Sequence, residues 1–523
     1  MVEAMISLAE FEREIALRDA KIERLQRQLD AVLRLLKKGK SERFVPSVDA
    51  AQGNLFDLPE QADIAQQTQT VRYERKVRAK PKKNHPGRAP LPDHLERREE
   101  VLEPELDPAY EWERIGEERT EVLEHEPGEL YVRVIVRPTY KKKAPCETSN
   151  EETFNEETSN EETQIVTAPL PERALPGSYA GEGLLAHLIV NKLVDHLPFD
   201  RQRRAMKRDY DLDIPKSTIN SWFAAVCTLL EPLYELLKAR VLAQDYLQAD
   251  ESRIEVLTTI AKDKHGKVKK NKRKLKPQTS KIRRGWMWVV HDPVHAYVVF
   301  NFEPGRGKAD ADALLGNYSG YLQVDGYSSY EDLLAEPGVI YVACTAHVRR
   351  KFFDALKNDR VRAEQALTLL AEMYRHEREV RPYTAAQRHA YRLIHLAPLL
   401  SAFKTWLDEQ CIRVTPKSTI GQAMSYAQNR YRGMKNVLLD GRLELDNNLI
   451  ENQIRPLALG RKNYLFAGSD AAAQRLAMLY SLFGTCKALG VNPHRWLKRV
   501  LQLIPETKMS ELGKLLPGKL KLD

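Results

Sequence analysis

The feature that most constrains the fold is a change of pattern between residues 245 and 345. Short runs rich in Val, Ile, Tyr and Trp, typical of β-strands, replace the long helical patterns there. Three runs come first, and two more then alternate with short helices expected near 308–316 and 328–335. This order predicts a mixed sheet with helices on its faces. The runs are YLQADESRIEVL (246–257), GWMWVVHD (285–292), AYVVFNF (296–302), YLQVDG (321–326) and VIYVACTA (339–346).

Two aspartates lie on these runs, and a glutamate far downstream completes a candidate set. Asp250 lies within the first run, and Asp325 ends the fourth. If these two strands are neighbours, both carboxylates can face one side of the sheet near its centre. Glu451 lies on an expected helix within LDNNLIENQIRPLALGRKNYLFAGS (445–469). The same stretch contains an expected basic loop, Gly460-Arg461-Lys462-Asn463.

Two strand carboxylates and one helix carboxylate predict a site for a pair of divalent ions. Mg²⁺ (or Mn²⁺) prefers oxygen ligands, so a few carboxylates and phosphate oxygens make a suitable set. Such a pair can cut and join a phosphodiester backbone. The alternative is that each carboxylate is a surface charge or a helix cap, and that Asp325-Gly326 is an ordinary turn. The strand order and the nearby Arg461 and Lys462 favour the metal site.

Residues 8–36 carry a heptad pattern in which steps of three and four alternate, and only Arg18 is polar. This narrow seam favours a coiled coil, and therefore self-association, over a single amphipathic helix packed on its own domain. The seam positions are Leu8, Phe11, Ile15, Arg18, Ile22, Leu25, Leu29, Val32 and Leu36.

Charge is strongly segregated along the chain, whose net charge is +9. Residues 262–284 hold 12 Lys or Arg and one Asp, a net charge of +11, and residues 72–88 form a second basic cluster. Residues 147–162 are acidic and of low complexity. Such segregation indicates a polyanionic partner for the basic segments, although a solvated loop has the same composition.

A helix-turn-helix is predicted within residues 182–240, which have a helical pattern. A basic helix (201–208) leads through a turn (209–215) into a second helix that begins at Lys216. Short polar side chains at a helix N-terminus can cap it or contact phosphates and base edges. Many helix pairs that do not bind DNA share this pattern. The candidate DNA contacts are Lys216, Ser217, Thr218 and Asn220.

Several classes of protein are disfavoured by the rest of the sequence. With 523 residues, several domains are expected. There is no apolar run of about 20 residues, as a membrane span needs, and the N-terminus lacks the pattern of a secretion signal. The five cysteines form no C-x-x-C pair, so free thiols in a reducing cytoplasm are expected, without a cysteine-based zinc site.

Taken together, these residues resemble the DDE transposases of the bacterial insertion-sequence sixty-six family, the TnpC-type protein. The resemblance runs nearly end to end and is strongest at 445–469. Its other segments are ADES (249–252), VDGYSSY (324–330), CTAHVRRKFFDALK (344–357), GKSERF (39–44) and residues 169–202.

The resemblance implies an RNase H-like catalytic core, interrupted by a helical insertion before the glutamate. The implied catalytic and metal-binding triad is Asp250, Asp325 and Glu451. Arg461 and Lys462 are expected to contact DNA phosphates, and Arg350 to face DNA, support the site or pack. One departure concerns a cysteine-rich zinc module of the family. Residues 88–168 keep only Cys146 there, so no zinc is expected.

The expected function is a transposase that binds the terminal inverted repeats of an insertion sequence and catalyses metal-dependent cleavage and strand transfer. A DNA-binding protein without catalysis, or a nuclease that hydrolyses and never joins, are the alternatives. Expected partners are element ends, target DNA, further copies of the chain and accessory proteins of the same element, in the nucleoid.

Eight segments are expected along the chain. They are a coiled-coil helix (1–40), a basic linker (41–90), a degenerate zinc-binding-like module with the acidic tract (91–168), a helix-turn-helix-like DNA-binding region (169–243), the first part of the RNase H-like core (244–358), a helical insertion (359–440), the catalytic Glu helix (441–470) and a C-terminal helical region (471–523).

Overall fold

The computed structural model describes residues 91–126, 128–142, 165–257 and 282–522. All of them belong to one compact unit, Gly87–Asp523. Four predicted segments lie wholly or almost wholly outside the described residues. They are the coiled coil (1–40), the basic linker (41–90), the acidic tract (147–162) and the basic segment 262–284. Those expectations stay predictions.

The first sheet is built around the long strand β3 (Glu129–Lys142), in which buried apolar residues predominate. It pairs antiparallel with β2 (Trp112–Glu126) and parallel with β1 (Arg97–Val101). The short strand β4 (Ile165–Thr167) pairs antiparallel with the end of β3. Apolar side chains of β2 and β3 are buried, and β2 packs against helix α3 (Glu182–Leu193).

The second sheet has five strands in the order β7-β6-β5-β8-β9. The first three along the chain pair antiparallel, and β5, β8 and β9 pair parallel. The mixed sheet expected from the sequence is therefore present, and its first and fourth strands are direct neighbours. The strands are β5 (Tyr246–Leu257), β6 (Ile282–Asp292), β7 (Tyr297–Glu303), β8 (Gly320–Val324) and β9 (Val339–Ala343).

Helices pack on this sheet and close one of its edges. On α13, Ser481 and Thr485 accept hydrogen bonds from the backbone amides of Phe300 and Val298 on β7. These contacts satisfy amides that an edge strand would otherwise expose. The helices associated with the sheet are α3 (Glu182–Leu193), α4 (Phe199–Tyr210), α5 (Lys216–Leu242), α6 (Lys308–Leu315), α7 (Glu331–Ala335), α12 (Asn448–Tyr464), α13 (Asp470–Ala488) and α14 (Pro493–Leu503).

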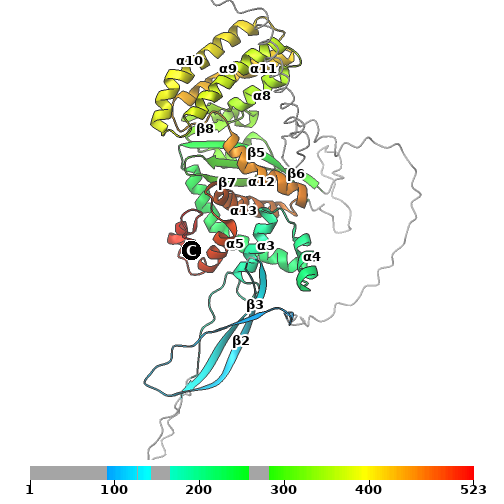
Figure 1. Cartoon of the computed structure of the whole chain (residues 1–523), viewed down its shortest axis with the longest axis vertical. Helices are drawn as coiled ribbons and strands as arrows, with labels where there is room; N and C mark the ends of the chain where they lie inside the picture. Colours follow the sequence, from blue (N-terminus) through cyan, green and yellow to red (C-terminus); the bar gives the residue numbers. More distant parts are fainter. Residues whose placement is uncertain (1–90, 127, 143–164, 258–281, 523) are drawn as a thin grey trace, which may run out of the picture. The chain divides into compact units, whose positions relative to one another are not determined.

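Four further helices form a bundle with a hydrophobic core of its own (Figure 1). The bundle continues from the sheet, because α11 packs against β9. Its largest buried polar side chain is Arg392, only 1% exposed, whose guanidinium is paired with Glu377. The helices are α8 (Thr345–Ala355), α9 (Arg360–Glu379), α10 (Ala385–Cys411) and α11 (Thr419–Lys435). Three short 3-10 turns are η1 (Ser328–Tyr330), η2 (Asn436–Leu438) and η3 (Met509–Leu515).

The predicted basic loop at 460–463 is wrong, because these residues form the last turn of α12. The helix continues through Gly460, whose missing side chain leaves room for the Tyr480 hydroxyl. It ends at Leu465, which adopts a positive φ of 64°. Among the described helices, none is long and apolar enough to cross a membrane.

Candidate active site

A five-residue pattern, Tyr-Leu-Gln-x-Asp, occurs on both β5 and β8 and ends at Asp250 in one case and Asp325 in the other. The two strands pair in register, so that Gln248 lies opposite Gln323. Asp250 continues β5 two residues beyond this pair, and Asp325 follows directly after the end of β8. The two aspartates lie close enough for the charge of Asp325 to raise the pKa of Asp250.

Buried amides of this strand pair form a connected hydrogen-bond network. The Gln248 Nε2 donates to the Gln323 Oε1 at 3.1 Å. The Tyr246 hydroxyl donates to the same Oε1 at 2.6 Å and accepts from the backbone amide of Glu444 at 3.0 Å. The Gln323 Nε2 donates to the Glu444 carbonyl at 2.8 Å. The strand pair is thereby tied to the segment that leads into α12.

The N-terminus of α12 is held directly by Gln248. The Nε2 of this side chain also donates to the Asp446 carbonyl at 3.2 Å, and its Oε1 accepts from the Ile450 amide at 3.2 Å. A free helix N-terminus has unsatisfied amides, and here a strand side chain satisfies one of them. Glu451 follows in the first turn, so one glutamine sets its helix relative to Asp250.

In the set of three carboxyl groups, neighbouring charges affect the pKa of Asp250 and that of Glu451. Burial raises the pKa of Asp250 well above its ordinary value, and the charges of Glu251, Asp325 and Glu451 raise it further. Burial also raises the pKa of Glu451, as do Asp446 and Asp325, while His347 and Arg350 act in the opposite direction. Crowded acids that destabilise one another's charge are typical of a site that gains from a bound cation.

The oxygen ligands of these three carboxylates fit hard divalent ions such as Mg²⁺ or Mn²⁺. A second group of candidate ligands adjoins them, because Cys344, His347 and Glu451 have ligand atoms within 4.8 Å of one another. The Cys344 sulfur accepts a hydrogen bond from the Asn447 amide, and burial raises the pKa of its thiol to about 12. The protonated thiol is a weak metal ligand, so these contacts position the start of α12.

Glu251, the residue after Asp250, has a buried environment that the sequence did not reveal. Its carboxylate accepts hydrogen bonds from the Arg306 guanidinium, at 2.8 Å from Nε, and from the Tyr330 hydroxyl at 2.9 Å. Arg306 in turn stacks on the Tyr327 ring, 3.6 Å from its centroid. The ion pair neutralises one acid next to the triad and anchors the VDGYSSY segment (324–330).

The two basic residues expected to contact phosphates have different environments. The Arg461 Nη1 donates to the Ser252 hydroxyl at 3.0 Å and to the Arg253 carbonyl at 2.8 Å, which ties the end of α12 to β5. Lys462 is exposed. Arg350 is an exposed residue of α8 that lies near enough to Glu451 to lower its pKa.

The predicted helix-turn-helix residues lie at the start of α5, away from the triad in the sequence and on different elements. Pro215 occupies the position before the helix, and no side chain there makes a capping bond. Lys216, Ser217 and Asn220 are exposed and Thr218 is half-buried, whereas the intervening Ile219 is buried. The polar side chains of this first turn therefore face solvent.

The fold is mixed α/β, and three acids lie near one another beside its central sheet. Comparisons with known proteins identify the family of this chain. A model of the IS66 transposase family matches residues 177–475, and models of the IS66 C-terminal element and of the "Transposase C of IS166 homeodomain" match residues 481–517 and 24–99. The chain belongs to the IS66 transposase family.

Curated relatives of similar length come from Sinorhizobium fredii (strain NBRC 101917 / NGR234). The protein named "Uncharacterized protein y4jD" is 30% identical over 451 residues, covering 83% of this chain and 82% of the relative. The protein named "Uncharacterized protein y4qI" is 32% identical, covering 84% of this chain and 79% of the relative. Their names state no activity.

Proposed function

We propose that this chain is a transposase that binds the terminal inverted repeats of its insertion sequence, cleaves DNA there and transfers the strand to a target. Asp250, Asp325 and Glu451 are the proposed catalytic and metal-binding residues. The observation that carries this proposal is the paired Tyr-Leu-Gln-x-Asp pattern, together with the glutamine that fixes α12 beside it.

The sheet supports an RNase H-like core. Three antiparallel strands come first, and β8 and β9 then extend the sheet from the other side of β5. The bundle α8–α11 lies in sequence between Asp325 and Glu451, as expected for a helical insertion. The bundle has a buried core, and its helix α11 packs against β9 at the edge of the sheet.

Divalent ions, when bound, would activate the attacking oxygen and stabilise the leaving oxygen of the scissile phosphate. The chain's own part is to hold three carboxylates in place with buried amides. Gln248 fixes both β8 and α12, and Arg306 neutralises Glu251, so that acid does not compete for the ions. Preorganised ligands of this kind lower the cost of ordering the site during reaction.

DNA contact is proposed for the exposed polar residues already described. Lys216, Ser217, Thr218 and Asn220 begin α5, Arg350 lies near Glu451, and Lys462 is exposed in the last turn of α12. Phosphate contacts of this kind position the duplex without reading its sequence. Self-association through residues 1–40 is also proposed, and its test is light scattering after their deletion. An unchanged oligomer mass would contradict it.

The deciding experiment incubates the purified chain with labelled element ends and target DNA in Mg²⁺ or Mn²⁺. Cleaved and joined products are expected, and Asp325→Asn should abolish both while end binding persists. The matched control is Asp332→Asn, which changes an exposed aspartate of α7. Product that is cut and never joined would indicate a nuclease. Full activity of Asp325→Asn would refute the proposed site, and binding without any product would indicate a DNA-binding protein.

A further inference from the structure

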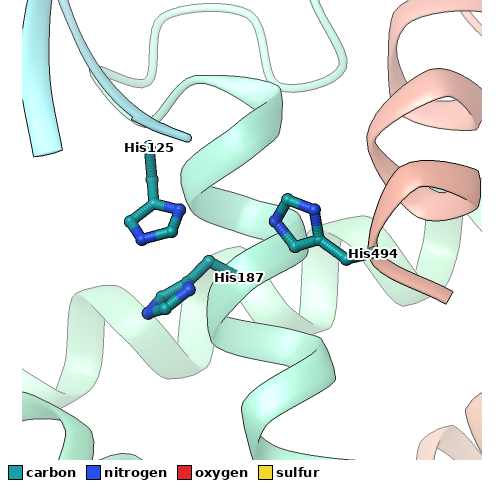
Figure 2. Close-up of side chains that lie close together, drawn as sticks. All are labelled: His125, His187 and His494. Carbon is teal, nitrogen blue, oxygen red and sulfur yellow. The ribbon is translucent and has the colours of Figure 1, made fainter. Parts of the chain in front are cut away.

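Three histidines from distant parts of the chain meet at a place remote in sequence from the acidic triad. His125 ends β2, His187 lies on α3 and His494 lies in the first turn of α14. One ring nitrogen of each lies within 4.8 Å of the corresponding nitrogens of the other two. Figure 2 shows the three rings turned toward a common space between these elements. The rings of His125 and His187 are stacked with centroids 3.7 Å apart.

Two of these rings have buried nitrogen atoms without a protein partner. Within the described residues, neither the Nδ1 of His125 nor the Nε2 of His494 makes a hydrogen bond. A buried polar atom normally has a partner, and leaving one without costs free energy. The Nε2 of His187 instead lies 3.0 Å from the Asn191 side chain. The contact atom of Asn191 is its Nδ2, which donates to an unprotonated Nε2. The Nδ1 of His187 has a lone pair for a metal when the Asn191 amide is turned over, so that its oxygen accepts from Nε2–H.

The surroundings of the three rings disfavour their charged forms. Burial, together with nearby imidazoles, lowers the pKa of His125 to about 3 and that of His187 to about 4. Burial lowers the pKa of His494 in the same direction. Neutral imidazoles repel a cation less than imidazolium ions do, and each offers a lone pair.

The surrounding structure holds the three elements in place independently of any ion. The carboxylate of Glu124 accepts a hydrogen bond from the Leu184 amide at 3.1 Å, and the Leu123 carbonyl accepts one from the Gly181 amide at 2.8 Å. Asn492 caps α14 by accepting from the amides of His494 and Arg495, both at 3.0 Å. The histidines therefore project from fixed positions, as metal ligands should.

We propose that His125, His187 and His494 form a binding site for a zinc-like transition metal ion, with water as the fourth ligand. Three imidazoles suit Zn²⁺ and Co²⁺, whereas Mg²⁺ prefers oxygen. Nitrogens about 3.3 Å apart surround a tetrahedral zinc with bonds of roughly 2.0–2.1 Å. The ligand atoms lie within 4.8 Å of one another, so metal binding requires the side chains, two of which are stacked, to rotate until their nitrogens reach that spacing. The ion joins the first sheet, α3 and the C-terminal element.

This site differs from the cysteine-rich zinc module that the sequence led us not to expect. It uses no cysteine, and its ligands come from three separate segments, so the spacing of residues along the sequence does not predict this site. It also differs from the proposed catalytic site in its ligand atoms. Its existence does not depend on the proposed transposase activity.

The test measures metal binding by the full-length chain carrying Asp325→Asn, which weakens the acidic site. We expect one equivalent of Zn²⁺ to remain after dialysis, and Co²⁺ to give the intense visible absorption of a four-coordinate ion. His494→Ala should lose both signals, and Zn²⁺ should no longer raise its Tm. The matched control is His295→Ala, whose half-exposed ring lies elsewhere and should leave both signals unchanged.

A second variant separates loss of a ligand from loss of the fold. His494→Cys replaces one zinc ligand by another, so it should restore the stoichiometry and add a sulfur-to-cobalt charge-transfer band. Undiminished metal binding by both His494→Ala and His187→Ala would overturn the proposal. So would the absence of bound Zn²⁺ and Co²⁺ from a parent chain that melts cooperatively.

Discussion

The side-chain amides of Gln248 and Gln323 are hydrogen bonded across two neighbouring strands, with 3.1 Å between Nε2 and Oε1. Each glutamine precedes a proposed metal-binding aspartate by two residues. One amide pair therefore sets the spacing of the two strands at the place where the acids emerge. The same Gln248 also holds the helix that carries Glu451.

Gln248→Met should disturb the site without removing an acid. The change leaves the Asp446 carbonyl and the Ile450 amide without this partner, at about 1–3 kcal/mol for each buried group. We expect the free energy of unfolding to fall by about 2–4 kcal/mol, and cleavage to fall more than end binding. Chemical denaturation and a cleavage assay measure the two effects. The control is Gln422→Met, which changes an exposed residue of α11. Equal losses of stability and cleavage in the two variants would refute the role of Gln248 in holding the site.

Arg461 and Lys462 should separate a structural role from a DNA contact. Arg461→Ala removes two hydrogen bonds to β5, so we expect a loss of about 1–3 kcal/mol of stability. Lys462→Ala should leave stability within about 0.5 kcal/mol and reduce the salt dependence of DNA binding by about one unit of slope. Binding titrations at several salt concentrations measure the slope. An unchanged slope for Lys462→Ala would remove it from the DNA surface.

Arg392 should be essential for the helical bundle. Its guanidinium pairs with Glu377 and donates to the carbonyls of Val437, Asp440 and Leu443. Arg392→Leu leaves a buried acid and three carbonyls without these donors, so we expect a loss of about 3–5 kcal/mol. Arg360→Leu, at an exposed ion pair, should cost less than about 1 kcal/mol. Thermal and denaturant melts measure the stability of both variants. Similar losses of stability for Arg392→Leu and Arg360→Leu would contradict the prediction.

Acid should destabilise the fold partly through His291 on β6. Burial lowers the pKa of this histidine to about 4, from an ordinary value near 6.5, so between these values the unfolded chain binds the proton more readily. Stability therefore falls as the pH decreases through this window, by up to about 3 kcal/mol for this group. His291→Gln should show a shallower loss between pH 6.5 and 4. His295→Gln is the control, and parallel pH profiles for His291→Gln and the parent would refute the assignment.

Sequence patterns anticipated the sheet because its strands are short, apolar and separated by clear turns. They also located Asp250 on a strand and Asp325 at the end of another, and the structure pairs these strands, with Asp325 directly after the last residue of β8. The repeated Tyr-Leu-Gln-x-Asp pattern could have predicted the register as well, since equal patterns on adjacent strands can align residue by residue. The roles of the glutamines appear only once both strands and α12 are assembled.

Other features could not be predicted from the sequence, because they depend on contacts between residues that are distant in the chain. Residues 460–463 contain Gly and several charges, which are typical of a loop, but burial of Gly460 against Tyr480 keeps the helix intact. His125 and His187 are 62 residues apart in the sequence and His494 follows 307 residues later, and the packing of α3 against β2 and of α14 against α3 brings them together. Contacts between distant segments cannot be inferred from the spacing of residues along the chain.

The bundle α8–α11 is synthesised after both strand aspartates and before Glu451. A ribosome that stops anywhere within the bundle releases a chain with two of the three proposed ligands and without the helix that supplies the third. Fragments of that kind lack a complete proposed site. The order of the segments thus makes completion of the polypeptide a condition for assembling the three acids.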